Sequence, residues 1–133
     1  MKWLLVGAST IAAEYMIWAM RGLPGGSVAH VTSGSAERAA EFAARYQIPA
    51  WGTDLDAALA APGIDAVYIS STNEKHHAQA MAAIAAGKHV LCEKPLGMSL
   101  AEAGEMVSAA EARGVVFATN HHLRCAGSHR AIR

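Results

Sequence analysis

The sequence predicts an α/β fold: a doubly wound parallel sheet with helices on both faces. Short apolar runs alternate along the chain with alanine-rich stretches of helical spacing. The apolar runs lack alternating polar positions, as is typical of strands buried on both faces of a parallel sheet. The length of 133 residues and the hydrophobic content of 53% suit one domain with a single buried core.

The expected strands and helices alternate, so each pair of parallel strands is joined by a right-handed crossover. The strands are expected at residues 2–6, 28–32, 66–70, 89–92 and 115–119, with a further short strand near 48–51. The helices are expected at residues 11–20, 36–46, 55–60, 75–86 and 100–113.

Residues at the ends of these helices support the assignment. Asp54 precedes the helix at 55–60 as an N-cap, and Ser99 with Glu102 has the spacing of a capping box. Gly87 and Gly114 follow two of the helices, where glycine commonly ends a helix.

The N-terminal region has two interpretations, because residues 3–20 are mostly apolar and follow Lys2, as in a signal peptide or a membrane span. Glu14 interrupts the stretch and Gly7 punctuates it. A strand, a turn and a helix therefore explain the pattern better.

Charge and cysteine content give further expectations about partners and location. Eleven Lys and Arg residues balance eleven Asp and Glu residues, so we expect neither nucleic acid nor a membrane as partner. Cys92 and Cys125 have no spacing that indicates a disulfide framework or a zinc site, which favours a cytoplasmic location.

A phosphate-binding turn is expected directly after the first strand, where Gly7 begins the segment at 7–12. Only the first glycine of a dinucleotide-binding fingerprint is present. Ser9 stands at the second position, where its hydroxyl could donate to a pyrophosphate, and Ala12 is tolerated at the third. A plain tight turn between strand and helix remains the alternative.

The end of the second strand favours NADP over NAD. Ser33 and Gly34 stand where an NAD-specific protein usually has a carboxylate for the ribose 2′-hydroxyl, and Arg38 follows within one helical turn. An arginine there can pair with a 2′-phosphate. The alternative is that Arg38 is simply a solvated helix residue.

Polar side chains follow the other strands at the same sheet edge, where open parallel sheets bind ligands. The segment at 71–76 could line the cofactor, although Thr72 or Asn73 could equally serve as an ordinary helix cap. Lys94, between Glu93 and Pro95, is the candidate for chemistry because its ammonium faces this edge. Pro95 biases Lys94 toward extended geometry, and the Lys94–Pro95 bond is either cis or trans.

Two further side-chain types are expected to have no catalytic role. The adjacent pairs His76, His77 and His121, His122 do not share a helix face, so no metal site is predicted. Cys92 is interpreted as a core residue because no base can be assigned to it.

Together these motifs resemble the glucose–fructose oxidoreductase, inositol dehydrogenase and MocA family (Gfo/Idh/MocA), whose hallmark is Glu, Lys, Pro at the fifth strand. The segments at 7–12, 71–76, 92–95 and 120–124 are most similar to members that reduce 1,5-anhydro-D-fructose. The resemblance covers essentially the whole chain. It implies a Rossmann-type fold and an NADP-dependent reductase acting on a sugar carbonyl, with a small sugar or polyol as substrate and Lys94 beside the reacting carbonyl. It implies cofactor contacts from Ser9, Thr10, Ile11, Ala12, Ser33, Gly34, Arg38, Ser71, Thr72, Asn73, Glu74, Lys75, His76, Glu93, Lys94 and Asn120.

Members of that family continue into a C-terminal substrate domain, and we expect that domain to be missing from this chain. We therefore expect an NADP-binding Rossmann domain at 1–120, and the start of a connection to the missing domain at 121–133. The sheet face and cleft edge that the second domain normally covers would then be exposed, and this surface could support a homo-oligomer. The alternative function is a non-catalytic dinucleotide-binding or assembly module derived from a truncated enzyme.

Overall fold

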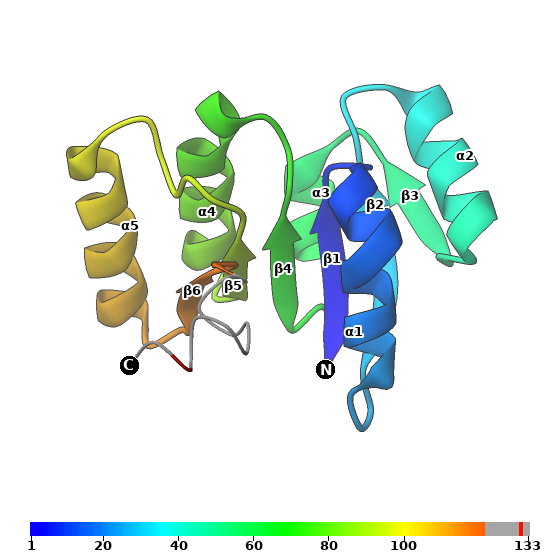
Figure 1. Ribbon diagram of the computed structural model, residues 1–133, viewed down its shortest axis with the longest axis horizontal. Helices are drawn as coiled ribbons and strands as arrows, with labels where there is room; N and C mark the ends of the chain where they lie inside the picture. Colours follow the sequence, from blue (N-terminus) through cyan, green and yellow to red (C-terminus); the bar gives the residue numbers. More distant parts are fainter. Residues whose placement is uncertain (122–130, 132–133) are drawn as a thin grey trace.

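The structure is a computed structural model that describes residues 1–121 and residue 131. Its centre is a parallel six-stranded sheet with the strand order β3-β2-β1-β4-β5-β6 (Figure 1). The predicted doubly wound α/β fold is confirmed. The strands are β1 (Lys2–Val6), β2 (Ser27–Thr32), β3 (Ala50–Gly52), β4 (Ala66–Ile69), β5 (His89–Cys92) and β6 (Phe117–Thr119).

Helices connect the strands and cover both faces of the sheet. They are the π-helical turn η1 (Ala12–Met16), α1 (Ile17–Gly22), α2 (Ala36–Tyr46), α3 (Leu55–Ala60), the 3₁₀ turn η2 (Asn73–Lys75), α4 (His76–Ala85) and α5 (Leu100–Arg113). Three of the five expected helices have the predicted bounds. The helix expected at 11–20 instead begins with the wider π-helical turn and ends at Gly22. The one expected at 75–86 divides into η2 and α4.

The last strand begins two residues later than expected because Val115 is used to end α5. Gly114 has φ +70°, and the N–H of Val115 donates to the carbonyl of Ala110 over 3.1 Å. This is the bond of a Schellman motif, which satisfies a carbonyl in the last helical turn. Val116 already accepts a bond from Val90, and β6 follows from Phe117.

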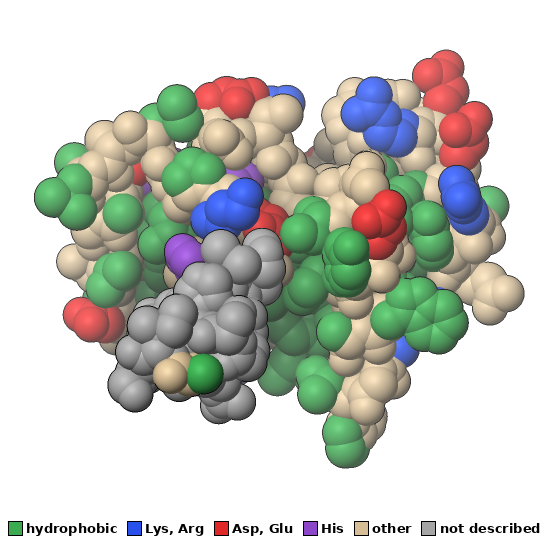
Figure 2. Space-filling model, in the orientation of Figure 1, with side chains coloured by type: hydrophobic (Ala, Val, Ile, Leu, Met, Phe, Trp, Pro, Cys, Tyr) green, Lys and Arg blue, Asp and Glu red, His purple; other side chains and the backbone are tan. Residues whose placement is uncertain are grey.

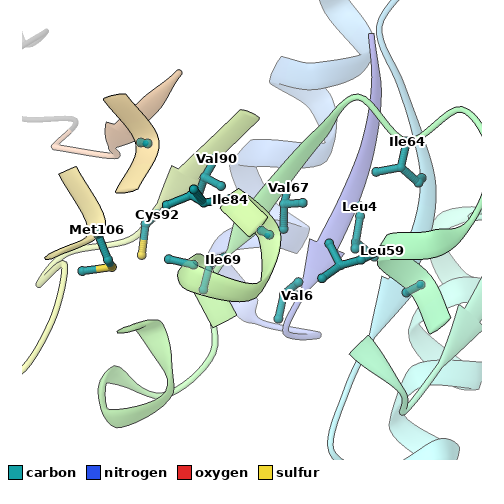
Figure 3. Packing of buried hydrophobic residues seen from close by; sticks show 14 residues of the cluster. Leu4, Val6, Leu59, Ile64, Val67, Ile69, Ile84, Val90, Cys92 and Met106 are labelled. Carbon is teal, nitrogen blue, oxygen red and sulfur yellow. The ribbon is translucent and has the colours of Figure 1, made fainter. Parts of the chain in front are cut away.

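Alternate residues of the strands pack against different helices. One face of the sheet presents Leu4, Val67 and Val90 to α3, α4 and α5, through residues such as Leu59, Ile84 and Met106 (Figure 3). The opposite face presents Leu5 and Tyr68 toward α1 and α2, in a separate cluster. Burial on both faces explains why these strands are apolar throughout.

The predicted end signals are largely confirmed. Asp54 accepts from the N–H of Ala57 at 3.0 Å, and Ser99 accepts from the N–H of Glu102 at 3.2 Å. Gly87 has φ +71°. The capping box at Ser99 differs in one respect, because the Glu102 carboxylate accepts from the N–H of Met98 at 2.7 Å instead of from Ser99.

Among the residues that the structure describes, no helix is both long and apolar enough to span a bilayer. On the face drawn in Figure 2, basic and acidic side chains are interspersed, without a large field of one sign.

Candidate cofactor site

The turn after β1 brings the chain into close contact with the end of β4. Gly7 has φ +110°, and its N–H donates to the carbonyl of Thr32 at 2.9 Å. A Cβ atom on Gly7 would lie 2.9 Å from backbone atoms of Ser70 and Ser71. Only glycine can adopt this positive φ without placing a Cβ atom against the backbone of Ser70 and Ser71, so the first position of the turn requires glycine.

Ser9 holds the turn in place through its hydroxyl. Its Oγ accepts from the N–H of Ala12 at 3.1 Å and donates to the Oγ of Ser70 at 2.7 Å. Ser70 in turn donates to the carbonyl of Gly7 at 3.4 Å. In this structure the Ser9 hydroxyl is therefore used within the protein, and its contact with a pyrophosphate stays a prediction.

The backbone of the first helical turn remains suited to an anion. The amides of Thr10 and Ile11 stand at the start of the helix, where N–H groups have no acceptor within the helix. Such amides favour a phosphate. Thr10 is exposed, Ile11 is half-buried and Ala12 is fully buried, so the Ala12 side chain cannot contact a bound group.

A groove of about 410 Å³ runs along this sheet edge, over the ends of β1, β2 and β4. Its volume lies in the usual range for a small-molecule site. The predicted site residues that line it are Ser9, Ser33, Gly34, Arg38, Ser71, Thr72 and Lys75. The groove is also lined by Thr53, Leu55, Ser70 and Gln79, which the sequence interpretation missed.

The charges around the groove favour an anionic ligand. Arg38 and Lys75 line it, and no Asp or Glu does so among the residues that the structure describes. Ser33 is anchored by its N–H, which donates to the carbonyl of Gly52 at 3.1 Å, and Ser35 accepts from the N–H of Arg38 at 3.3 Å. These bonds fix the start of α2, so the exposed Arg38 side chain leaves from a defined position beside the groove.

Three of the predicted site residues from 71–76 do not line the groove. Asn73 and Glu74 are exposed in η2, where the Glu74 carboxylate accepts from the Thr72 hydroxyl, and that bond lowers the Glu74 pKa. Thr72 precedes η2, but its side chain makes no capping bond to a backbone N–H. The capping role considered for Thr72 is thus not observed.

His76 is the third, and it is buried with 1% of its surface exposed. Its Nδ1 lies 2.7 Å from the carbonyl of Pro95, and its Nε2 lies 3.2 Å from the carbonyl of Ser71. The ring therefore joins the loop after β5 to the segment after β4. Both of its ring nitrogens face protein carbonyls, and the predicted contact of His76 with the cofactor stays a prediction.

The ends of β4, β5 and β6 form a second group of predicted residues, next to the groove. Glu93 is buried, and its Oε1 accepts from the Tyr68 hydroxyl at 2.7 Å and from the Asn120 Nδ2 at 2.6 Å. Lys94 follows Glu93 and is exposed, with a cis bond to Pro95. The structure thus places Glu93, Lys94 and Asn120 together at one edge of the sheet, as the strand-end argument predicted.

Cys92 lies in the core, as expected. It is fully buried, and burial together with the neighbouring Glu93 raises the pKa of its thiol to about 12. A thiol that keeps its proton is a poor nucleophile. Within residues 1–121 and 131, no group of three or more His, Cys, Asp or Glu side chains comes together as metal ligands would.

The strand order, the glycine turn after β1 and the groove at the carboxyl ends of the strands define a Rossmann fold of the dinucleotide-binding type. Comparison with known proteins agrees. The chain belongs to the GFO_IDH_MocA family, described as "Oxidoreductase family, NAD-binding Rossmann fold", which matches residues 1–121. The resemblance inferred from the sequence is confirmed.

Relatives and solved structures place the chain within this family. It is 54% identical over 132 residues to 1,5-anhydro-D-fructose reductase of Ensifer adhaerens. It is 50% identical over 87 residues to scyllo-inositol 2-dehydrogenase (NADP(+)) of Bacillus subtilis (strain 168). A 3-ketoreductase from Actinomadura kijaniata, in complex with NADP and TDP-benzene, superposes with a TM-score of 0.91 at 27% identity. Biliverdin reductase from Synechocystis sp. PCC 6803, in complex with biliverdin and NADP+, superposes with a TM-score of 0.88 at 30% identity.

The chain corresponds to less than half of each of these proteins. The alignments cover 99% of this chain but 39% of the Ensifer reductase, and 65% of this chain but 26% of the Bacillus dehydrogenase. Both solved structures are matched over 99% of this chain, which corresponds to 40% of the ketoreductase and 41% of the biliverdin reductase. The chain is therefore an NAD(P)-binding Rossmann domain of an oxidoreductase family.

Proposed function

We propose that this chain binds NADP in preference to NAD and supplies the cofactor half and the catalytic lysine of a reductase for a sugar carbonyl, such as that of 1,5-anhydro-D-fructose. The observation that carries the cofactor preference is the groove wall formed by Ser33, Gly34 and Arg38. It offers a hydroxyl and a guanidinium at the end of β2 and no carboxylate.

The 2′-phosphate is the one group that distinguishes NADP from NAD. A carboxylate at the end of β2 would bind the ribose 2′-hydroxyl of NAD and repel the 2′-phosphate of NADP. Ser33 removes that repulsion. Arg38 can donate charge-assisted hydrogen bonds to the phosphate, and Lys75 adds a second cation to the same groove.

The names of related proteins support the same choice. NADP occupies the two solved structures described above, and the Bacillus dehydrogenase is named for NADP(+). The sugar carbonyl substrate is proposed from the Ensifer reductase, with which this chain shares 54% identity.

Lys94 is proposed as the group that assists hydride transfer from the cofactor. When bound, the cofactor supplies a hydride to the substrate carbonyl. Lys94 is exposed beside the buried Glu93, at the edge where a ligand would lie. Its ammonium can donate a hydrogen bond or a proton to the carbonyl oxygen, where negative charge develops during reduction.

Calorimetric titration of this chain with NADP+ and NAD+ tests the cofactor preference. We expect tighter binding of NADP+, and we expect Arg38→Ala to weaken NADP+ binding by about tenfold or more while leaving NAD+ binding nearly unchanged. Arg113→Ala, at the distant end of α5, is the matched control. The proposal fails if NADP+ does not bind or if NAD+ binds more tightly.

A chimera tests the catalytic role of Lys94. Residues 1–121 of this chain would replace the matching part of the Ensifer adhaerens reductase, which supplies the remaining length. We expect NADPH-dependent reduction of 1,5-anhydro-D-fructose, and we expect Lys94→Ala to lower kcat by about a hundredfold. Turnover that Lys94→Ala leaves unchanged would exclude the lysine from the chemical step.

A further inference from the structure

We infer that Tyr68 is a positioning residue for the nicotinamide end of the cofactor: through Glu93 it fixes the amide of Asn120 as a hydrogen-bond acceptor for the ligand. This inference rests on the proposed binding of NADP. Tyr68 is fully buried in β4, in an otherwise apolar strand, and its hydroxyl donates to Glu93 Oε1 at 2.7 Å.

The network crosses the ends of three adjacent strands. Tyr68 belongs to β4, Glu93 follows β5 and Asn120 follows β6, and these strands are neighbours in the sheet. The backbone is fixed as well. The N–H of Glu93 donates to the carbonyl of Ile69 at 2.9 Å, and the N–H of Asn120 donates to the carbonyl of Cys92 at 2.8 Å. Each member therefore has little freedom to move.

The hydrogen bonds determine which side of the Asn120 amide is available to a ligand. Nδ2 donates to Glu93 Oε1 at 2.6 Å and lies 3.6 Å from the sulfur of Met16. Since an amide carries its donors and its acceptor on opposite arms, Oδ1 is directed away from the carboxylate. The amide oxygen is an acceptor, and the carboxamide N–H group of nicotinamide is a matching donor.

Tyr68 keeps this arrangement stable because it remains a donor. Burial, followed by the bond to the Glu93 carboxylate, raises the pKa of its phenol far above the usual range. The hydroxyl therefore keeps its proton and continues to satisfy Glu93, which is only 7% exposed. Removing the hydroxyl would leave a buried carboxylate with one donor fewer, and the Asn120 amide would lose its fixed partner.

The location separates this network from the groove that would hold the phosphates. The groove lies over the ends of β1, β2 and β4 and is lined by neither Glu93 nor Asn120. A dinucleotide that places its phosphates and adenosine in the groove would extend its other end across β4 toward β5 and β6. Tyr68 should therefore affect only that other end of the ligand.

Two ligands distinguish this role from a general effect on folding. NADP+ carries the nicotinamide, whereas 2′,5′-ADP carries only the adenosine end with its phosphates. We expect Tyr68→Phe to weaken NADP+ binding by about five- to tenfold and to leave 2′,5′-ADP binding unchanged, as measured by calorimetry on this chain. The fluorescence of NADPH, which comes from the nicotinamide, should also shift less on binding to this variant. Tyr15→Phe, on an exposed tyrosine of η1, is the matched control.

A second variant keeps the test independent of the folding of Tyr68→Phe. Glu93→Gln replaces the shared acceptor and leaves Tyr68 in place, and we expect the same selective loss of NADP+ binding. Equal losses for both ligands, or unchanged NADP+ binding in both variants, would overturn the role of Tyr68. If the unaltered chain bound neither ligand, the proposed function itself would fail.

Discussion

Ser9 and Ser70, which are 61 positions apart in the chain, share a hydrogen bond of 2.7 Å between their hydroxyl groups. The bond joins the turn after β1 to the end of β4, and Ser9 also accepts from the first turn of the following helix. In this chain a pair of serines thus provides the contact between turn and strand at the position where a dinucleotide-binding fingerprint has its second glycine.

Replacing Ser70 should loosen this turn. Ser70→Ala removes the acceptor for Ser9 and a donor to the carbonyl of Gly7, and Ser70 is only 8% exposed. We expect the free energy of unfolding in urea to fall by about 1 kcal/mol. Ser108→Ala, on the exposed side of α5, is the control and should not lower the midpoint. A Ser70→Ala midpoint equal to that of the original chain would contradict the role of this bond.

Two glycine-to-alanine substitutions should have effects of opposite sign. Gly7→Ala places a Cβ atom 2.9 Å from the backbone of Ser70 at a φ of +110°, so we expect a loss of stability of about 1–3 kcal/mol. Gly104→Ala lies inside α5, where the new Cβ meets no atom within 4 Å, and should stabilise the protein by about 0.5–1 kcal/mol. Denaturant unfolding of both variants checks this. A stabilising Gly7→Ala would contradict the close approach of the turn to β4.

His30 should make the stability fall as the pH falls. Burial lowers its pKa below the ordinary value of 6.5, and its Nε2 is buried without a hydrogen-bond partner among the described residues. As the pH drops through 6.5, the unfolded chain takes up a proton before the folded protein does, so acid favours unfolding.

The contribution of His30 to stability is therefore complete above its unfolded pKa and is lost as the pH falls through the folded value. We expect His30→Leu to show a shallower decrease in unfolding free energy between about pH 7.5 and about pH 5. An identical slope for His30→Leu and the original chain would contradict the prediction.

Cys92 should resist alkylation in the native protein. Its thiol is fully buried, and its pKa is raised to about 12. In a Cys125→Ser background we expect iodoacetamide to label Cys92 only at the rate at which the protein unfolds, with rapid labelling in denaturant. Mass spectrometry follows the reaction. Fast labelling in native buffer, in protein whose circular dichroism is unchanged, would show that Cys92 is accessible.

The fold was largely predictable because its signals are local. Asp54, Ser99 and Gly114 mark helix ends through bonds to residues only a few positions away. The observed bounds differ from the predicted ones where two neighbouring elements compete for the same residue. Val115 has the character of a strand residue, but its N–H is used to close α5. The π-helical turn η1 has no comparable signal in the sequence.

Site residues could be predicted from the sequence only where their place directly after a strand determines their location. The positions of Arg38, Lys94 and Asn120 after their strands predicted that they lie at the ligand-binding edge of the sheet. In the structure Arg38 lines the groove, and Lys94 and Asn120 lie together at that edge. These positions could not show which groups are already satisfied within the protein. The burial of His76, and the use of the Ser9 hydroxyl by Ser70, depend on contacts between distant segments. Tyr68 carried a weak signal, as the only hydroxyl within the apolar residues of β4.

The position of β1 in the sheet has a consequence for synthesis on the ribosome. This strand is made before the other strands of the sheet, yet it lies between β2 and β4 and pairs with both (Figure 1). Until residues 66–69 leave the exit tunnel, the nascent chain carries an apolar strand with one edge unpaired. Unpaired apolar edges bind other chains readily. Translation that pauses before β4 would therefore leave this edge of β1 open to other chains, and a chaperone could protect it.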